Sequence, residues 1–187
     1  VADRDRFQKW MDWYAVEVKK VPALSTGMPT YGTPALVASI GKMLGAMGSY
    51  NHRTEWFEKW ELISGERQKR DYWLKDTGCP ACPIACSKVF RAKDGKWKGA
   101  TSEGPEFETL YSLGSMCGIA DLGAVIQGDI SCDEWGMDTI TYGVTASWVM
   151  EAYDNGLLTK EKTDGVDFKF GNDDAMIAYI EKTAKRQ

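Results

Sequence analysis

Three of the chain's five cysteines fall within one short stretch, GCPACPIAC. Cys79, Cys82 and Cys86 form a C-x2-C-x3-C arrangement, with Pro80 and Pro83 between them. Thiolates are soft ligands that select zinc, copper(I) or iron–sulfur clusters. The short spacings let the first two sulfurs converge on one centre, and the prolines reduce the backbone entropy lost on binding. The motif therefore predicts a metal or cluster site in this loop.

The chain offers no second pair of ligands to complete this site. Structural zinc takes four cysteines or histidines, but His52 is the sole histidine, and Cys117 and Cys132 stand singly. A [4Fe–4S] cluster can take its fourth thiolate from a distant part of the chain. We therefore favour an iron–sulfur cluster, with zinc or buried inert thiols as alternatives. The odd and clustered cysteines disfavour disulfides and fit a cytoplasmic protein.

The composition excludes several classes of partner. With 187 residues, 43% of them hydrophobic, the chain is long enough for one domain with its own core. Its net charge of -4 provides no basic surface, so we expect neither nucleic acid nor an anionic membrane as partner. The longest apolar runs, such as 34–40, are far shorter than the roughly 20 residues that a bilayer span needs.

The N-terminal half is predicted to consist of helices interrupted by glycine and proline. Apolar residues at spacings of three and four predict amphipathic helices over residues 3–20 and 34–47. Thr33 followed by Pro34 has the form of a helix cap and a first-turn proline. Ser64 is expected to cap a helix through GERQKRDYWL that leads into the cysteine loop.

The C-terminal half is predicted to hold one hairpin and several helices. The stretch KVFRAKDGKWKG, residues 88–99, resembles two short strands joined by an Asp-Gly turn. Further helices are expected behind caps at Asp121, Asp138 and Asn172. The predicted fold class is all-α, a multihelical bundle with one small β-hairpin. Most of the eight tryptophans are expected to lie in its core.

Several motifs occur together in an order that resembles a known enzyme family. CPACPIAC, SEGPEFETLYSLG, CDEWGMDTITYG and NGLLT resemble the aldehyde:ferredoxin oxidoreductase family of tungsten, sometimes molybdenum, enzymes. YGTPALVASIGKMLGAM is similar to that family's GT-x-x-L-V helix, and the resemblance runs over about 26–159. It implies a metal held by two pterin dithiolenes beside a [4Fe–4S] cluster. Ferredoxin or another low-potential carrier would then be the electron-transfer partner.

The resemblance also implies that the chain is a fragment of a larger enzyme. Residues 1–187 would be its central helical domain, with a cluster loop at 78–90, the hairpin at 88–99 and a pterin-contacting loop at 132–139. The three clustered cysteines would be cluster ligands. The family's β-rich N-terminal pterin domain, second pterin motif and fourth cluster cysteine have no counterpart here, so we expect them outside this chain.

By resemblance, the stretch DEWGMD contacts the pterin. Asp133, Gly136, Met137 and Asp138 match the family's D-x-x-G-L-[DC] motif, with methionine in the place of leucine. Carboxylates accept hydrogen bonds from the pterin's ring nitrogens, and a glycine allows a close approach of the backbone. The structural alternative is a helix cap at Asp138 and a turn at Gly136.

Glu108, in GPEFET, matches the glutamate that the family places near tungsten. A carboxylate there would move protons as the substrate gains or loses oxygen. The alternative is that Glu108 and Glu106 are first-turn acids stabilised by the helix dipole. Some members carry E-x-x-H before the pterin motif, for an iron shared across a dimer interface. Gln127 and Ile130 occupy those places here, so that iron is expected to be absent and oligomerisation stays open.

One branch of the family offers roles for two further residues. The tungsten subunit of aromatic acyl-CoA reductases places a cysteine on the metal and a histidine near the substrate. Cys117 and His52 are the candidates for these catalytic roles, against the alternatives of a core cysteine and a surface histidine. Cys132 is expected to be simply buried.

Three functions remain open at this point. The first is part of a cytoplasmic tungsten-pterin oxidoreductase that oxidises small aldehydes to carboxylates, with aryl-CoA reduction as the alternative reaction. The second is a stand-alone iron–sulfur electron-transfer module whose cluster is completed by Cys117 or Cys132. The third is a zinc-stapled binding domain. For the first, we expect the isolated chain to be inactive, because it lacks half of each cofactor's surroundings.

Overall fold

The computed structural model describes residues 1–187. Its N-terminal half is helical, with 3-10 and π-type segments marked η: α1 (Arg4–Glu17), η1 (Val18–Lys20), η2 (Ala23–Gly27), α2 (Met28–Tyr31), η3 (Val37–Leu44), η4 (Trp60–Ile63), α3 (Gly65–Arg67) and η5 (Gln68–Tyr72). The remainder holds β1 (Trp73–Asp76), β2 (Lys88–Arg91), β3 (Thr101–Glu103), α4 (Phe107–Thr109), η6 (Leu110–Ser115), α5 (Leu122–Trp135), α6 (Thr139–Asp154) and α7 (Asp173–Lys185). The predicted helix-rich fold with a small β element is confirmed, and the sheet has three strands rather than the two of the predicted hairpin.

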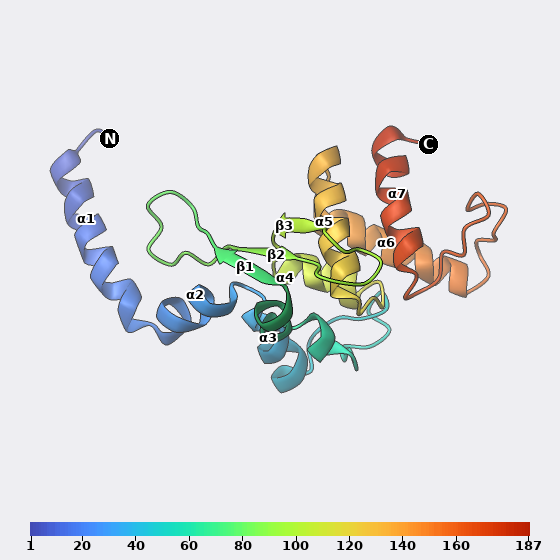
Figure 1. Ribbon diagram of the computed structural model, residues 1–187, viewed down its shortest axis with the longest axis horizontal. Coiled ribbons are helices and arrows are strands. Elements are labelled where there is room, and N and C mark those ends of the chain that lie inside the picture. Colours follow the sequence, from blue (N-terminus) through green and yellow to red (C-terminus); the bar gives the residue numbers. More distant parts are fainter.

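The elements are arranged with the sheet between two helical parts (Figure 1). Helix α1 extends from one end of the molecule, whereas α5, α6 and α7 gather at the other. No helix is both long and apolar enough to cross a bilayer.

Helix starts were the most predictable feature of the chain. Asp121, Asp138, Asn172 and Ser64 each accept a hydrogen bond from a backbone N–H two or three residues further on, at 2.7–3.2 Å. Such a bond satisfies one of the amides that a first helical turn leaves unpaired. Four of the five predicted caps are therefore confirmed.

The small sheet has three strands in the order β1-β2-β3, and both pairings are antiparallel. The expected hairpin over 88–99 differs, because its second strand lies at Thr101–Glu103 rather than in KWKG. The indole Nε1 of Trp97 donates to Asp173 at 2.9 Å, which holds the intervening loop against α7. Strand β1 was expected to be the end of a helix; η5 instead ends at Tyr72.

The core lies where η6 and α5 pack with α6 and α7. Leu110, Leu113, Val125, Ile126 and Met176 are all fully buried there. Burial of each such side chain stabilises the fold by about 1.5–3 kcal/mol. The core therefore holds the helix that follows GPEFET and the helix that leads into DEWGMD against each other.

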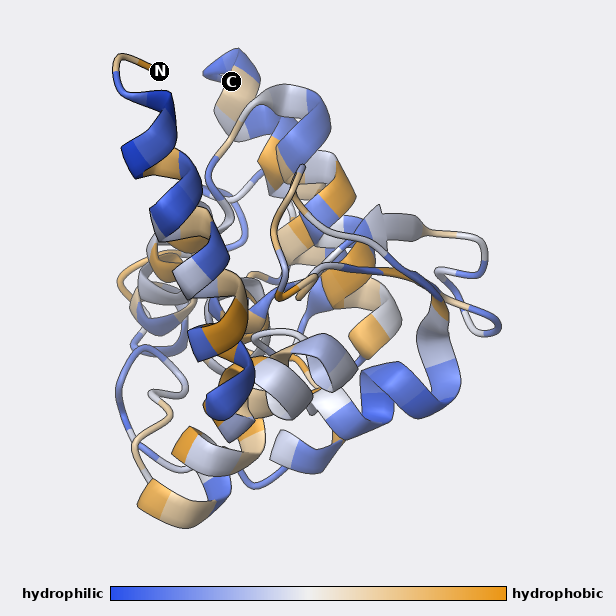
Figure 2. Cartoon of the chain, turned by 90° about the vertical axis from the view of Figure 1, so that its left-hand side faces the viewer, coloured by the Kyte–Doolittle hydropathy of each residue, from blue (hydrophilic) through white to orange (hydrophobic).

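The tryptophans depart from expectation, because none of them is fully buried. Six are at least 37% exposed: Trp10, Trp13, Trp56, Trp73, Trp135 and Trp148. Helix α1 forms as predicted, behind a cap at Asp3, yet it buries none of its residues. In Figure 2 its ribbon is mostly hydrophilic, with isolated hydrophobic positions. The apolar side chains of α1 are therefore not part of this chain's core.

Candidate functional site

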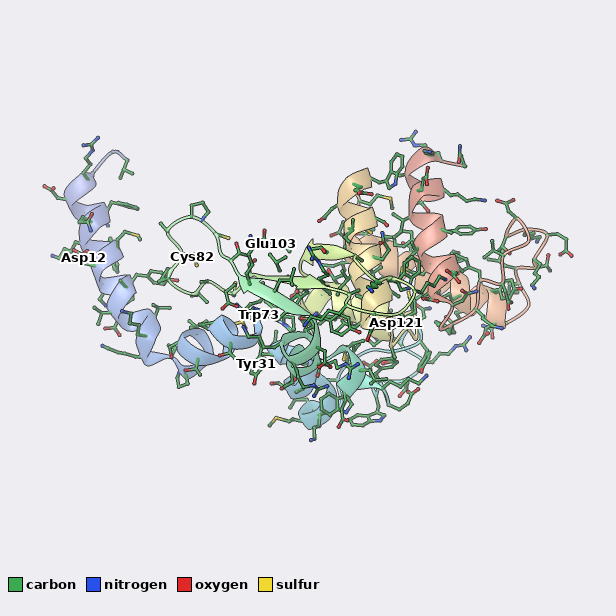
Figure 3. All side chains as sticks on the ribbon, viewed as in Figure 1. Asp12, Tyr31, Trp73, Cys82, Glu103 and Asp121 are labelled. Atoms are coloured by element: carbon green, nitrogen blue, oxygen red, sulfur yellow. The ribbon has the colours of Figure 1, made fainter.

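The cysteines lie on a loop, residues 77–87, that joins β1 to β2 and projects from the sheet (Figure 3). Its base is closed by the amide of Thr77, which donates to the carbonyl of Ser87 at 2.9 Å. Ala81 and Ala85 have φ values of 60° and 48°, in the left-handed region that L-residues seldom adopt. One left-handed residue thus lies between each pair of successive cysteines.

All three thiols of this loop are free. Cys79 is exposed, and Cys82 and Cys86 are partly buried. The sulfurs are not gathered at one point, since no group of three or more histidine, cysteine, aspartate or glutamate side chains is placed to hold a metal ion. The donor set of three soft thiols nevertheless fits an iron–sulfur cluster or zinc rather than a hard cation.

Lys88, the first residue of β2, lies directly beneath the cysteine loop. Its side chain is only 1% exposed, and its Nζ donates to three consecutive carbonyls, those of Ala85, Cys86 and Ser87, at 3.0–3.3 Å. Burial lowers the pKa of its ammonium group. Sequence reasoning missed this residue because lysine is almost never fully buried.

The end of the cysteine loop is connected to the GPEFET segment through Gly32 and Thr33. A Cβ on Gly32 would lie 2.8 Å from the carbonyl oxygen of Cys86 and 3.8 Å from a carboxylate oxygen of Glu106. Thr33 does not cap the helix that follows it, which begins without a side-chain cap. Its hydroxyl instead accepts from the amide of Phe107 at 2.8 Å and donates to Glu106. The predicted cap was therefore assigned to the wrong helix.

Glu108 lies in α4, next to the loop that holds DEWGMD. The hydroxyls of Thr109 and Thr139 are 2.9 Å apart, and Ser112 Oγ donates to the carbonyl of Thr139 at 3.0 Å. These contacts fix the start of α6 against the helix that carries Glu108. The Glu108 side chain itself is exposed. Its carboxylate is thus presented at the surface beside the 136–138 loop.

The DEWGMD residues form the connection between α5 and α6. Gly136 ends α5 in the left-handed conformation, with a φ of 64°. Asp138 begins α6 and accepts from both the amide and the hydroxyl of Thr141, which lowers the pKa of its carboxyl group. Met137 packs against the core, and Asp133 is exposed. Both structural roles of this motif are therefore present, and pterin binding by its four residues stays a prediction.

Asp129, one helical turn before Asp133, is a buried carboxyl group that the sequence analysis did not select. It is 7% exposed and accepts from the Ser102 hydroxyl at 2.5 Å. Burial raises its pKa to about 6, and the charges of Asp133 and Glu106 act in the same direction. The sequence signal for it was an aspartate that lies between the apolar residues Ile126 and Ile130 of a predicted helix.

His52 lies beside Tyr111, one turn after Glu108 on the same continuous helix. Its Nε2 is 2.8 Å from the Tyr111 hydroxyl and its Nδ1 is 2.9 Å from Glu55. Residues 50–52 are all left-handed, with φ values of 52°, 54° and 60°. This turn holds the imidazole on the side of the helix that carries Tyr111.

Cys117 and Cys132 lie inside the core with 0% exposure. The Cys117 thiol faces the carbonyls of Ser112 and Gly143, each at 3.4 Å, and burial raises its pKa far above the ordinary range. Burial also raises the pKa of Cys132 to about 12. These positions favour packing roles, as expected for Cys132, and give Cys117 no path to a ligand at the surface.

A half-open, mostly apolar pocket of about 420 Å³ lies behind the 136–138 loop, between α6 and α7. Its wall is formed mainly by Met137, Tyr142, Ala146, Val149, Phe168 and Tyr179. It is separate from the cysteine loop, which contributes none of its lining.

Comparison with known proteins supports the resemblance. A family model described as "Aldehyde ferredoxin oxidoreductase, domains 2 & 3" matches residues 9–187. The chain is 36% identical over 191 residues to a protein of Pyrococcus abyssi and 36% identical over 188 residues to one of Thermococcus kodakarensis. Both relatives are named tungsten-containing aldehyde ferredoxin oxidoreductase, and each alignment covers 100% of this chain.

A more distant relative is the aliphatic sulfonate oxidoreductase, WOR-like subunit, of Pyrococcus furiosus. It is 25% identical over 157 residues, which cover 84% of this chain and 25% of that protein. The chain spans about 30% of the length of the Pyrococcus abyssi and Thermococcus kodakarensis relatives. With a family model over nearly all of its residues and relatives above 30% identity over its whole length, this chain belongs to the aldehyde ferredoxin oxidoreductase family.

Proposed function

We propose that the protein to which this chain belongs is a cytoplasmic, tungsten-pterin oxidoreductase that oxidises aldehydes to carboxylates with ferredoxin as electron acceptor. The observation that carries the proposal is the packing of GPEFET against both the cysteine loop and the DEWGMD loop. Gly32 and Thr33 connect the first pair, and the contact between Thr109 and Thr139 connects the second. Three motifs far apart in the sequence are thereby linked through neighbouring residues, which supports the proposal.

Each motif has a role in this proposal. Cys79, Cys82 and Cys86 supply three thiolates to a [4Fe–4S] cluster. The residues of DEWGMD, from Asp133 to Asp138, contact a pterin through carboxylate oxygens and backbone. When bound, the metal-pterin would supply two-electron redox chemistry, and the cluster held by these cysteines would supply one-electron transfer.

Glu108 is the residue proposed to handle protons. Oxidation of an aldehyde to a carboxylate, with water as the source of oxygen, releases two electrons to the acceptor and three protons, so a base near the reacting carbon is required. The Glu108 carboxylate is exposed on α4, beside the DEWGMD loop, and is free to accept a proton from water as the carbon–oxygen bond forms.

The alternative of an aryl-CoA reductase depends on a cysteine that binds the metal. The two other cysteines of this chain, Cys117 and Cys132, have no exposed surface, and the Cys117 thiol faces two backbone carbonyls. Aldehyde oxidation does not require either of them. We therefore propose the aldehyde reaction. His52 lies close to the helix that carries Glu108, through its contact with Tyr111.

The test is metal analysis of the full-length protein purified without oxygen, followed by assays with an aldehyde panel and ferredoxin. We expect tungsten, about four iron atoms per chain from one cluster, and aldehyde-dependent reduction of ferredoxin. The isolated 187-residue chain should show no turnover. Zinc as the bound metal, or aldehyde turnover by the isolated chain, would contradict the proposal.

A further inference from the structure

Lys88 has surroundings that are unusual for a lysine. Its side chain is 1% exposed, and three consecutive carbonyl oxygens, from Ala85 to Ser87, accept from its Nζ at 3.0–3.3 Å. These carbonyls belong to the last residues of the cysteine loop, and the middle one is that of Cys86. The ammonium group therefore fixes the backbone on both sides of the third cysteine.

Two carboxylates of the chain, those of Asp76 and Glu106, act on this ammonium, and only Asp76 lies within ion-pair distance. The nearest carboxylate, that of Asp76, lies 3.8 Å away. Its Oδ1 also accepts from Lys69 Nζ at 3.0 Å and from Trp73 Nε1 at 2.9 Å. A buried charge without a full partner costs several kcal/mol. Carbonyl dipoles compensate part of this, and a further anion on the loop would compensate the rest.

An iron–sulfur cluster held by thiolates is such an anion. With four cysteine ligands its net charge is negative in both redox states and one unit more negative when reduced. We propose that Lys88 is the buried counter-charge of the cluster on the cysteine loop, which it both positions and makes easier to reduce. This inference rests on the proposed function, since it assigns a partner to the cluster proposed there.

The direction of the effect follows from electrostatics. A nearby positive charge stabilises the more negative, reduced cluster more than the oxidised one, and burial keeps solvent from screening it. Lys88→Met keeps the length of the side chain and removes the charge. It should shift the equilibrium between reduced and oxidised cluster at least tenfold toward the oxidised form, which is a fall of about 59 mV in the midpoint potential.

Lys69 provides a matched control. It carries the same charge and binds the same carboxylate, Asp76, but its side chain is 27% exposed rather than 1%. Solvent screens such a charge, so Lys69→Met should change the redox equilibrium less than twofold. Lys88→Arg keeps the positive charge and should also stay within twofold of the wild type.

The measurement is a redox titration of the full-length protein, followed by electron paramagnetic resonance of the reduced cluster. A tenfold shift in Lys88→Met alone supports the proposal, and an intact cluster with an unchanged potential overturns it. If Lys88→Met loses its cluster, the redox potential of the cluster in Lys88→Arg tests the proposal instead. A cluster with near-wild-type potential in that variant supports a role of the charge, and any other result overturns it. Absence of iron from the wild type would instead refute the proposed function itself.

Discussion

The imidazole Nε2 of His52 lies 2.8 Å from the hydroxyl of Tyr111, and its Nδ1 lies 2.9 Å from the carboxylate of Glu55. The three side chains form one hydrogen-bonded row, although Tyr111 follows His52 by 59 positions in the sequence. Tyr111, at one end of the row, follows Glu108, the proposed proton acceptor, by one helical turn.

We expect Tyr111→Phe to lower the free energy of unfolding by about 1 kcal/mol, since one hydrogen bond is lost while the ring remains. His52→Ala should have a similar effect, and the two changes together should be less than additive because they remove the same contact. Urea unfolding of the single and double variants measures this coupling. Tyr14→Phe on α1 is the control. Strictly additive effects would show that the pair does not interact.

The five thiols should react in two groups. Cys79, Cys82 and Cys86 lie on an accessible loop, whereas Cys117 and Cys132 are fully buried with raised pKa values. Only thiolates are nucleophilic, so iodoacetamide should modify the first three rapidly in metal-free, reduced protein. Peptide mapping by mass spectrometry should find the other two modified only after unfolding. Fast modification of Cys117 in the folded protein would contradict its placement.

Local signals explain what the sequence predicted correctly. The caps at Asp121, Asp138 and Asn172 each bind an amide within their own first turn, so a short stretch of sequence contains all the information. The cysteine motif is recognisable in the same way, because its spacing is itself the signal, and its role as a set of cluster ligands stays a prediction.

The incorrect predictions concern residues whose conformation depends on a contact with a partner far away in the sequence. Thr33 has the residue type and position of a cap, but its hydroxyl binds the amide of Phe107, far away in the sequence. The loop before β3 is shaped by the contact between Trp97 and Asp173. Lys88 was not selected because nothing in its neighbours indicates that the cysteine loop folds over its ammonium group. Tertiary contacts of this kind override local propensity.

Glu108→Gln tests the proposed proton acceptor. The amide keeps the shape of the side chain and cannot take up a proton, so kcat for aldehyde oxidation in the full-length protein should fall about 10²–10⁴-fold. Tungsten and iron contents should stay at wild-type levels, because Glu108 is not proposed to bind either. Glu103→Gln, at an exposed position in β3, is the control. Full activity in Glu108→Gln would remove this residue from the mechanism.

Gly143 marks the close crossing of α6 and η6. A Cβ at this position would lie 2.5–2.8 Å from the backbone and side chain of Ser112, so the helices would have to separate. Gly143→Ala should therefore lower the free energy of unfolding by about 1–3 kcal/mol. Gly27→Ala is the matched control, since nothing lies within 4 Å of its added Cβ. That change should be neutral or stabilise the protein by about 0.4–1 kcal/mol. Equal effects of the two substitutions on the free energy of unfolding would contradict the close crossing of α6 and η6.

Asp129 should make stability depend on pH in an unusual direction. Burial raises the pKa of its carboxyl group from 3.8 to about 6, so between these values the folded protein binds more protons than the unfolded chain. Stability from this residue is therefore fully present below pH ~4 and is lost as the pH rises through about 6. The loss amounts to about 3 kcal/mol.

Asp129→Asn removes the titrating group and keeps the shape that faces Ser102. Relative to the wild type, this variant should gain about 3 kcal/mol of stability between pH 4 and pH 7, as measured by urea unfolding at both values. Asp94→Asn, in the exposed loop after β2, should show the same dependence of stability on pH as the wild type. The charges of Asp133 and Glu106 act in the same direction as burial, so neutralising either should reduce the difference. A constant offset between Asp129→Asn and the wild type at both pH values would mean that the Asp129 carboxyl group has the same pKa in the folded and the unfolded protein, and that water reaches this carboxylate in the folded protein.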